Sequence, residues 1–355
     1  MRTIEILDGG LFTTVQDLGR VGYQRYGVAV SGAMDAFALR AANRLTGNAD
    51  TEAGLEITLV GPEVRFRQQA LIAVTGADIG ACMDGRPFQM WRTTAVRAGS
   101  VLSFSGLRDG MRSYVAVDGG IDVPVVLGSR STSTRSRLGG VEGRRLQTGD
   151  VLALGDPAAG RAAIRRAMAP SEIPTYRHEH RVRVVLGPQD DAFTDGGRST
   201  FVTAVYTMTS QSDRIGCRFD GPRIAHRTSA DIVSDGTSLG IVQVSGDGMP
   251  IVLMADRGTT GGYTKIATVI SADVSRLAQA APGDRVRFEA VDLDEACVRR
   301  RAQQAMLDAL VTPEAAGRPV SADDVYDEDA GGGLAADGFG DLADALGRTG
   351  WGTDR

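Results

Sequence analysis

The stretch SDGTSLGIVQVSGDGMPIVLMADRGTTGGYTKIATVI, residues 234–270, divides into short apolar runs separated by glycine-rich turns. The runs GIVQVSG (240–246) and PIVLMAD (250–256) each have the length of one strand and contain several Val and Ile residues. Clusters of Gly, Asp, Ser and Thr bound these runs, and such residues favour tight turns between strands. The stretch therefore predicts consecutive β-strands at hairpin spacing.

The same pattern continues in both directions along the chain. The further runs are IEIL (4–7), ALIAVTG (70–76), MRSYVAVDGG (111–120), DVLALG (150–155), VRVVLG (182–187), FVTAVYTM (201–208) and RVRFEAV (285–291). Regular helical patterns do not alternate with these runs, which disfavours a doubly wound α/β sheet. We therefore predict a mainly β chain with a few helices.

The chain is expected to fold as two β units. The first spans residues 1–175 and the second spans 182–291, with a polar, Ala- and Arg-rich connector before the second. Residues 292–311 have the composition of a helix. The segment 312–355 is acidic and rich in Gly and Ala, a composition typical of disordered segments.

One helix is predicted within the first unit, in SGAMDAFALRAANRLTGN (31–48). Its apolar residues recur at intervals of three and four, which places them on one helical face. Ser31 is the expected N-cap, and Asp35 is expected in the first turn, where the helix dipole favours a negative charge. Gly47 supplies the expected C-terminal stop.

The charge of the chain is unevenly distributed. The net charge is −5 overall, but segment 312–355 holds ten acidic and three basic residues, a net charge of −7. The remainder carries about +2 and has no Lys/Arg run, which argues against a nucleic-acid partner. No apolar run is long enough to span a membrane, and the three cysteines form neither a disulfide framework nor a metal knuckle. A cytoplasmic location is expected.

Lys265 is the single lysine among 39 basic residues. A codon bias toward arginine would replace lysine wherever the two residues are interchangeable. They are not interchangeable where a compact ammonium is required. Lys265 is therefore a candidate functional residue, although chance survival at a surface position would explain it too.

Candidate catalytic residues gather around Lys265 in the stretch 234–270. Its ammonium can stabilise developing negative charge, and the Gln243 amide can hold an amide or ureido group. Arg257 offers a fork for a carboxylate or phosphate. The sequence GTTGGY (258–263) is permissive enough for backbone N–H groups to converge on an anion, although a plain hairpin explains it as well. The expected catalytic residues are Lys265, Gln243, Asp235 and Tyr263, and the expected substrate-binding residues here are Arg257, Thr260, Gly261 and Gly262.

Two other stretches are also rich in polar and glycine residues. TTVQDLGRVGYQRYGVAVSGAMD (13–35) contributes Tyr23, Ser31 and Asp35 as expected substrate-binding residues. SQSDRIGCRFDGP (210–222) contributes Arg214. His178 and His180 alternate as a metal pair on a strand would, but no third ligand cluster accompanies them, so no metal site is expected.

Three stretches together resemble the allophanate hydrolase subunit 2 family, also called the biotin-dependent carboxyltransferase family or the 5-oxoprolinase C subunit family. They are GLFTTVQDLGRVGYQRYGVAVSGAMDAFALRAANRLTGN, SDRIGCRFDGP and the stretch 234–270. The likeness covers about residues 3–291. It implies two tandem cyclophilin-like β-barrel units with a few helices. It also implies a partner, the B subunit of 5-oxoprolinase (allophanate hydrolase subunit 1-like), which can be separate or fused.

Three functions follow from this resemblance. One is ATP-dependent opening of the lactam 5-oxoproline to glutamate, together with the A and B subunits. Another is carboxyl transfer from carboxybiotin to urea or a similar amide. The third is regulatory, the antagonism of a kinase inhibitor. The only lysine lies in GGYTK rather than in a biotin-acceptor motif. The expected function is therefore a 5-oxoprolinase subunit with ATP as cofactor of the complex, while biotin remains the alternative.

Overall fold

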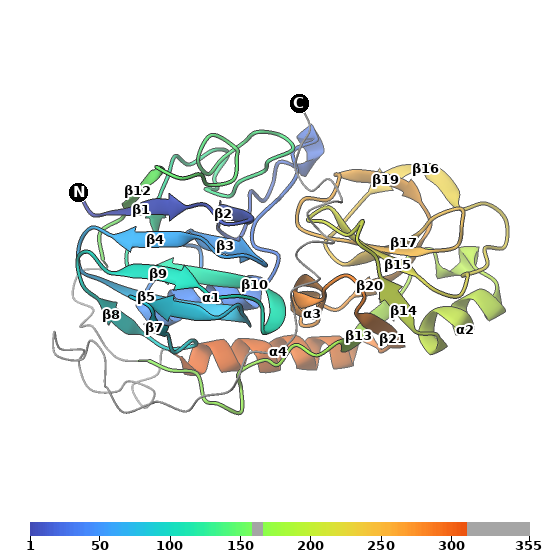
Figure 1. Ribbon diagram of the computed structural model, residues 1–355. Helices are drawn as coiled ribbons and strands as arrows, with labels where there is room; N and C mark the ends of the chain where they lie inside the picture. The colour runs from blue at the N-terminus through green and yellow to red at the C-terminus, as the bar shows by residue number, and fades with distance from the viewer. Residues whose placement is uncertain (158–165, 311–355) are drawn as a thin grey trace.

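The computed structural model describes residues 1–157 and 166–310. Within these ranges the chain is mainly β with few helices, as the sequence predicts. Figure 1 shows two halves side by side, with α3 (Val274–Gln279) between them and α4 (Leu293–Ala309) running from beneath the N-terminal half to beneath α3. The predicted acidic tail, residues 312–355, lies outside the described residues.

The N-terminal half is built from two sheets. The larger sheet has the order β11-β12-β1-β4-β9-β6-β7 and comprises β1 (Thr3–Asp8), β4 (Glu63–Phe66), β6 (Ala81–Met83), β7 (Arg86–Pro87), β9 (Val101–Phe104), β11 (Ile121–Asp122) and β12 (Val151–Leu154). The smaller has the order β2-β3-β10-β5-β8 and comprises β2 (Phe12–Gln16), β3 (Gly54–Thr58), β5 (Ala70–Asp78), β8 (Thr94–Val96) and β10 (Asp109–Val117).

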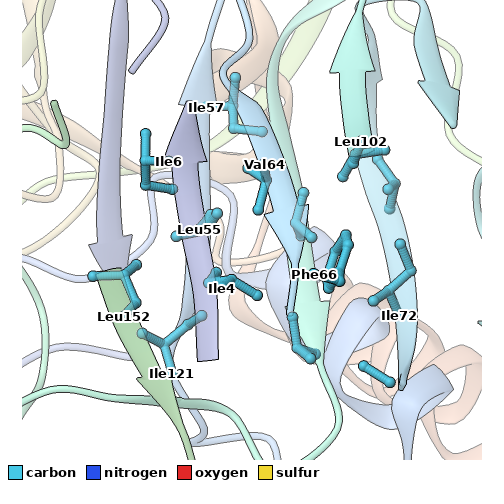
Figure 2. Close-up of a cluster of buried hydrophobic side chains, with 14 of the residues drawn as sticks. Ile4, Ile6, Leu55, Ile57, Val64, Phe66, Ile72, Leu102, Ile121 and Leu152 are labelled. Atoms are coloured by element: carbon cyan, nitrogen blue, oxygen red, sulfur yellow. The ribbon is translucent and has the colours of Figure 1, made fainter. Parts of the chain in front are cut away.

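The apolar residues of these strands form one core between the two sheets. Ile4 and Phe66 come from the larger sheet, Leu55 and Ile72 come from the smaller, and all four side chains are fully buried. Figure 2 shows them among the clustered side chains of this core. Burial of side chains of this size contributes about 1.5–3 kcal/mol each. This core fixes the position of β3, which carries a residue of the candidate site.

Helix α1 (Ala36–Thr46) is present, but it begins later than the sequence predicts. Asp35 is its N-cap, and the carboxylate accepts a hydrogen bond from the Ala38 amide at 3.0 Å. Ser31 is not the cap, because the helix begins only at Ala36 and the Ser31 hydroxyl has no hydrogen-bond partner among the described residues. Its backbone has a φ of 56°, and its amide donates to the Ala255 carbonyl at 3.1 Å. Gly47 ends the helix in the left-handed conformation, as expected.

The C-terminal half is a closed barrel with the strand order β13-β20-β17-β18-β15-β14-β21. Its strands are β13 (Glu179–Leu186), β14 (Tyr206–Met208), β15 (Gly216–Asp220), β17 (Ile241–Val244), β18 (Pro250–Leu253), β20 (Lys265–Val269) and β21 (Arg285–Ala290). The predicted run 201–208 is only partly a strand, because its first residues belong to α2 (Asp195–Thr203) and only its last three form β14. The ring of Phe201 stacks on Phe288 in the core.

A two-stranded ribbon accompanies the barrel and is seen above it in Figure 1. It consists of β16 (Asp231–Gly236) and β19 (Thr260–Tyr263), paired antiparallel. Short 3₁₀ helices η1 (Gln24–Tyr26) and η2 (Asp190–Ala192) complete the described elements. Among the described helices, none is long and apolar enough to cross a membrane.

Helix α4 confirms the helix predicted at 292–311 and joins the two halves. Its Gln304 accepts a hydrogen bond from Arg40 of α1 at 2.8 Å, and its Asp308 pairs with Arg44 at 2.7 Å. Leu307 is fully buried in the apolar cluster that covers α1. The helix therefore ties the C-terminal end of the described chain to the N-terminal half.

Candidate functional site

Lys265 lies at the start of β20 and is almost completely buried, with 1% of its surface exposed. Its Nζ forms an ion pair with the carboxylate of Asp235 on β16, which is exposed. The hydrogen bond from Lys265 lowers the pKa of the Asp235 carboxyl below its ordinary value. A buried ammonium needs a counter-charge, and the ribbon supplies it.

Gln243 stands directly opposite Lys265 in the β17–β20 pair. Residues opposite one another in an antiparallel pair project from the same face of the sheet. The Gln243 amide is buried and donates through Nε2 to the Tyr263 carbonyl of β19 at 3.3 Å. The ammonium and the amide therefore both reach toward the β16–β19 ribbon, on the face turned away from the core residues Val242 and Val244.

The sequence GTTGGY is expected to form a loop whose N–H groups bind an anion, but most of it forms a strand of the ribbon. Thr260–Tyr263 is a strand, with Gly261 opposite Asp235 and Thr260 opposite Gly236. Successive N–H groups of a strand point in opposite directions, so those of Gly261 and Gly262 do not converge on one point. Gly261 is required instead for close packing, because a Cβ there would lie 2.5 Å from Gln243 Nε2.

Arg214 is buried in an ion-pair network between the two halves. Its Nε and Nη2 donate to the Asp256 carboxylate at 2.8 and 3.2 Å, and its Nη1 pairs with Glu56 of β3. Nη2 also donates to the Gly32 carbonyl at 2.6 Å. Burial acts to lower the pKa of this guanidinium, but the two carboxylates outweigh burial and raise it. With these contacts, Arg214 holds the halves together, and its guanidinium N–H groups are engaged by the protein instead of by a substrate.

Asp35 belongs to a second contact between the halves. Its carboxylate accepts a hydrogen bond from the Gln279 amide of α3 at 2.9 Å as well as from the α1 amide. Its backbone amide donates to the Tyr114 hydroxyl, which in turn donates to Glu56, both at 2.8 Å. Burial raises the pKa of the Asp35 carboxyl. The contacts of Asp35 therefore cap a helix and join the two halves.

The loop after β2, which carries Tyr23 and Ser31, contacts the C-terminal half at Thr237 and at Ala255. The amide of Gln24, next to Tyr23, donates to the Thr237 carbonyl at 3.2 Å. Ser31 contacts Ala255, as described above, and Arg257 is buried two residues further along the chain. Together with the Arg214 contacts to Gly32 and Asp256, these bonds bring all three predicted stretches into contact.

Sequence reasoning missed Glu56, Gln279 and Tyr114, which complete the network between the halves. The sequence holds one indication for Glu56, because this acidic residue interrupts the short strand GLEIT. In the structure its side chain is 1% exposed. Ionised side chains are almost never buried unless they are paired. Gln279 and Tyr114 gave no such signal, because a buried amide or phenol is common in strands and helices.

The cluster can bind and polarise a planar amide. An ammonium has three donors, and Asp235 accepts one hydrogen bond from the Lys265 ammonium, which among the described residues leaves two for a substrate oxygen. The Gln243 amide lies beside it and offers both a donor and an acceptor. Donors fixed in a buried position stabilise charge that develops on a carbonyl oxygen, and such a donor contributes roughly 2.7–4 kcal/mol. Within the described residues, no group of three or more metal-ligating side chains gathers.

The family model of the carboxyltransferase domain, subdomain A and B, matches residues 26–290. The chain therefore belongs to this family, and the resemblance seen in the sequence is confirmed.

Curated relatives divide into two groups. The chain is 40% identical to the C subunit of 5-oxoprolinase from Haemophilus influenzae and 38% identical to that from Escherichia coli, in each case over 86% of this chain and 97% of the relative. It is 33% identical to urea amidolyase of Saccharomyces cerevisiae, over 86% of this chain and 18% of that protein.

Solved structures agree with this assignment. The structure of the Kluyveromyces lactis urea carboxylase superimposes with a TM-score of 0.82 at 30% identity, covering 91% of this chain and 30% of that one. The structure of TTHA0988 gives a TM-score of 0.73 at 32% identity, covering 81% and 56% of the two chains.

Proposed function

We propose that this chain is the C subunit of a 5-oxoprolinase that opens the lactam of 5-oxoproline to glutamate with the A and B subunits. The observation that carries the proposal is the buried ammonium of Lys265 beside the Gln243 amide. The relatives named as 5-oxoprolinase C subunits support it, because this chain spans 97% of their length.

The chemistry of ring opening requires the groups found at this site. When water attacks a lactam, negative charge develops on the carbonyl oxygen. The free donors of the Lys265 ammonium would bind that oxygen, and the Gln243 amide would orient the ring. Asp235 holds the ammonium in place through the ion pair, and Tyr263 contributes its carbonyl to the position of Gln243.

The described site does not fit a nucleoside triphosphate. Phosphates bind where successive backbone N–H groups converge, as in glycine-rich loops at helix N-termini. Thr260–Tyr263 is instead a paired strand. The proposal therefore assigns ATP to the partner subunits and derives no step through it on this chain. The cytoplasmic location and the A and B partner subunits remain predictions.

Reconstitution tests the proposal. This chain is mixed with its cognate A and B subunits, and glutamate and ADP release from 5-oxoproline and ATP are measured with each component omitted in turn. We expect turnover only when this chain is present, with equal amounts of the two products. Turnover that is unchanged without this chain would contradict the proposal.

Carboxyl transfer to urea or a similar amide is the second candidate. It is favoured by the TM-score of 0.82 to the urea carboxylase structure and by the family's carboxyltransferase description. The same Lys265 and Gln243 could hold a ureido group, because it presents the same planar donor and acceptor pattern. Inhibition of the complex by avidin would favour this reaction, and insensitivity to avidin would favour lactam opening. The regulatory alternative predicts partner binding without turnover.

A further inference from the structure

The loop that precedes α1 packs against the turn between β18 and β19, forming a junction between the two halves. We call the contact of residues 19–32 with residues 254–258 the loop–turn junction. The Ser31 amide donates to Ala255, as described above. The Gly258 carbonyl accepts from the Thr237 hydroxyl at 2.5 Å, and the Thr237 carbonyl accepts from Gln24. Because Thr237 lies two residues from Asp235 in the chain, the junction adjoins the Lys265 cluster.

Three buried hydrogen-bonding atoms in this junction have no partner among the described residues. They are Arg20 Nη1, Ser31 Oγ and Arg257 Nε. The three side chains are exposed by only 0%, 5% and 6%, respectively. Leaving a buried donor unpaired costs about 1–3 kcal/mol, and more when it is charged, so each of these atoms calls for a partner that the described residues do not supply.

The two arginines also lack a carboxylate partner within the described residues. Arg20 is held by the carbonyls of Val126 and Ser131 at 3.3 and 2.5 Å, and Arg257 by that of Met254 at 3.3 Å. The charges of Asp17 and Asp256 act on Arg20, and that of Asp256 acts on Arg257. The Asp17 oxygens accept hydrogen bonds from the 129–131 segment, and both Asp256 oxygens accept from Arg214. Burial outweighs such charges and lowers the pKa of both groups. Each of the two guanidinium groups therefore keeps a buried donor that an anionic ligand would satisfy.

We propose that the loop–turn junction binds the carboxylate of the lactam acid, through Arg20, Ser31 and Arg257, while Lys265 and Gln243 hold its ring amide. This inference rests on the proposed function, because it assigns the second functional group of the same substrate. Guanidinium and hydroxyl donors match the two oxygens of a carboxylate. The junction is bordered by exposed residues, namely segments 21–22 and 25–27 and Gly258. A small acid would enter from this exposed side.

Ser31→Ala is the sharpest variant, because it removes only an oxygen that has no partner among the described residues. Without a ligand, this change leaves the thermal stability of the chain equal to or above that of the wild type. Arg257→Gln removes the charge and keeps a polar side chain. Arg181→Gln, at an exposed position on β13, is the matched control.

Two measurements use these variants. The first is isothermal titration of the full chain with 5-oxoproline, with 2-pyrrolidinone, and with acetate or phosphate. Because 2-pyrrolidinone is the same lactam without the carboxylate, the comparison identifies the group that binds. In the second, the reconstituted complex gives KM and kcat for 5-oxoproline. We expect Arg257→Gln to weaken 5-oxoproline binding and raise KM about tenfold or more, and Ser31→Ala several-fold. Binding of 2-pyrrolidinone should not change, and Arg181→Gln should behave as the wild type.

The failure of this inference is distinct from the failure of the proposed function. If the complex turns over 5-oxoproline and both variants keep the wild-type KM, the carboxylate site is wrong and the function stands. If the chain binds acetate or phosphate through Ser31 and Arg257 but does not bind 5-oxoproline, the junction takes a free anion and the substrate assignment is overturned.

Discussion

Replacing Gly261 by alanine should damage catalysis far more than stability. The new Cβ would lie 2.5 Å from Gln243 Nε2, whereas ordinary van der Waals contact begins near 3.4 Å. The amide must therefore move by about 1 Å, and displacement of a positioning group by this distance can cost about 100-fold in rate. We expect kcat/KM for 5-oxoproline to fall by about 10–100-fold in the reconstituted complex.

The stability of this variant should change little. The hydrogen bond from Gln243 to Tyr263 is long, at 3.3 Å, and a typical bond contributes about 0.5–1.5 kcal/mol. Alanine reduces the entropy of the unfolded chain, which offsets about 0.4–1 kcal/mol. Thermal unfolding should therefore show a net change below about 1 kcal/mol.

Gly262→Ala is the matched control, because the nearest atom to its new Cβ is the Ile232 carbonyl oxygen at 3.6 Å. Its kcat/KM should stay within about twofold of the wild type. If the two alanine variants had equal kcat/KM, or if Gly261→Ala lost activity only through unfolding, the positioning role of Gln243 would be refuted.

Two further predictions concern stability. Arg214→Met leaves the buried carboxylates of Glu56 and Asp256 without their cation, so calorimetry should show a loss of about 3–5 kcal/mol. That corresponds to a fall in Tm of about 6–10 °C, and a fall below about 2 °C would contradict the network's role. Burial acts to raise the pKa of Asp284, but hydrogen bonds led by that from His180 outweigh it and lower the pKa. The carboxylate therefore stabilises the fold above its unfolded-state pKa of about 4, so the urea-unfolding difference between wild type and Asp284→Asn should shrink as pH falls below that value. If the difference in unfolding free energy between the wild type and Asp284→Asn grew as pH fell, the stabilising role of the Asp284 carboxylate would be contradicted.

The strands could be predicted from sequence because their signal is local. A short run of Val and Ile between turn residues has few alternatives to a strand, and the predicted helices at 31–48 and 292–311 were found for the same reason. Errors arose where distant contacts override local preference. Ser31 is held by the Ala255 carbonyl of the other half, and Asp35 caps the helix in its place. Phe201 lies in a helix, and its ring stacks on Phe288 in the barrel core.

The candidate site could be predicted only in part. Lys265, Gln243 and Asp235 come from one continuous stretch of sequence, so the turns between their strands bring them together. Glu56 pairs with Arg214 across 158 positions, and no periodicity in the sequence reports that contact. Likewise, the glycines of β19 indicated an unusual backbone but not whether it is a loop or a closely packed strand.

The measurement that tests the central claim most directly is Lys265→Met in the reconstituted complex. The change removes a buried charge and keeps much of the length of the side chain, so the fold and partner binding should persist. We predict that glutamate release falls by at least about 100-fold while the complex still elutes as one species in gel filtration. Turnover within a few-fold of the wild type would contradict the claim that Lys265 stabilises the reacting amide.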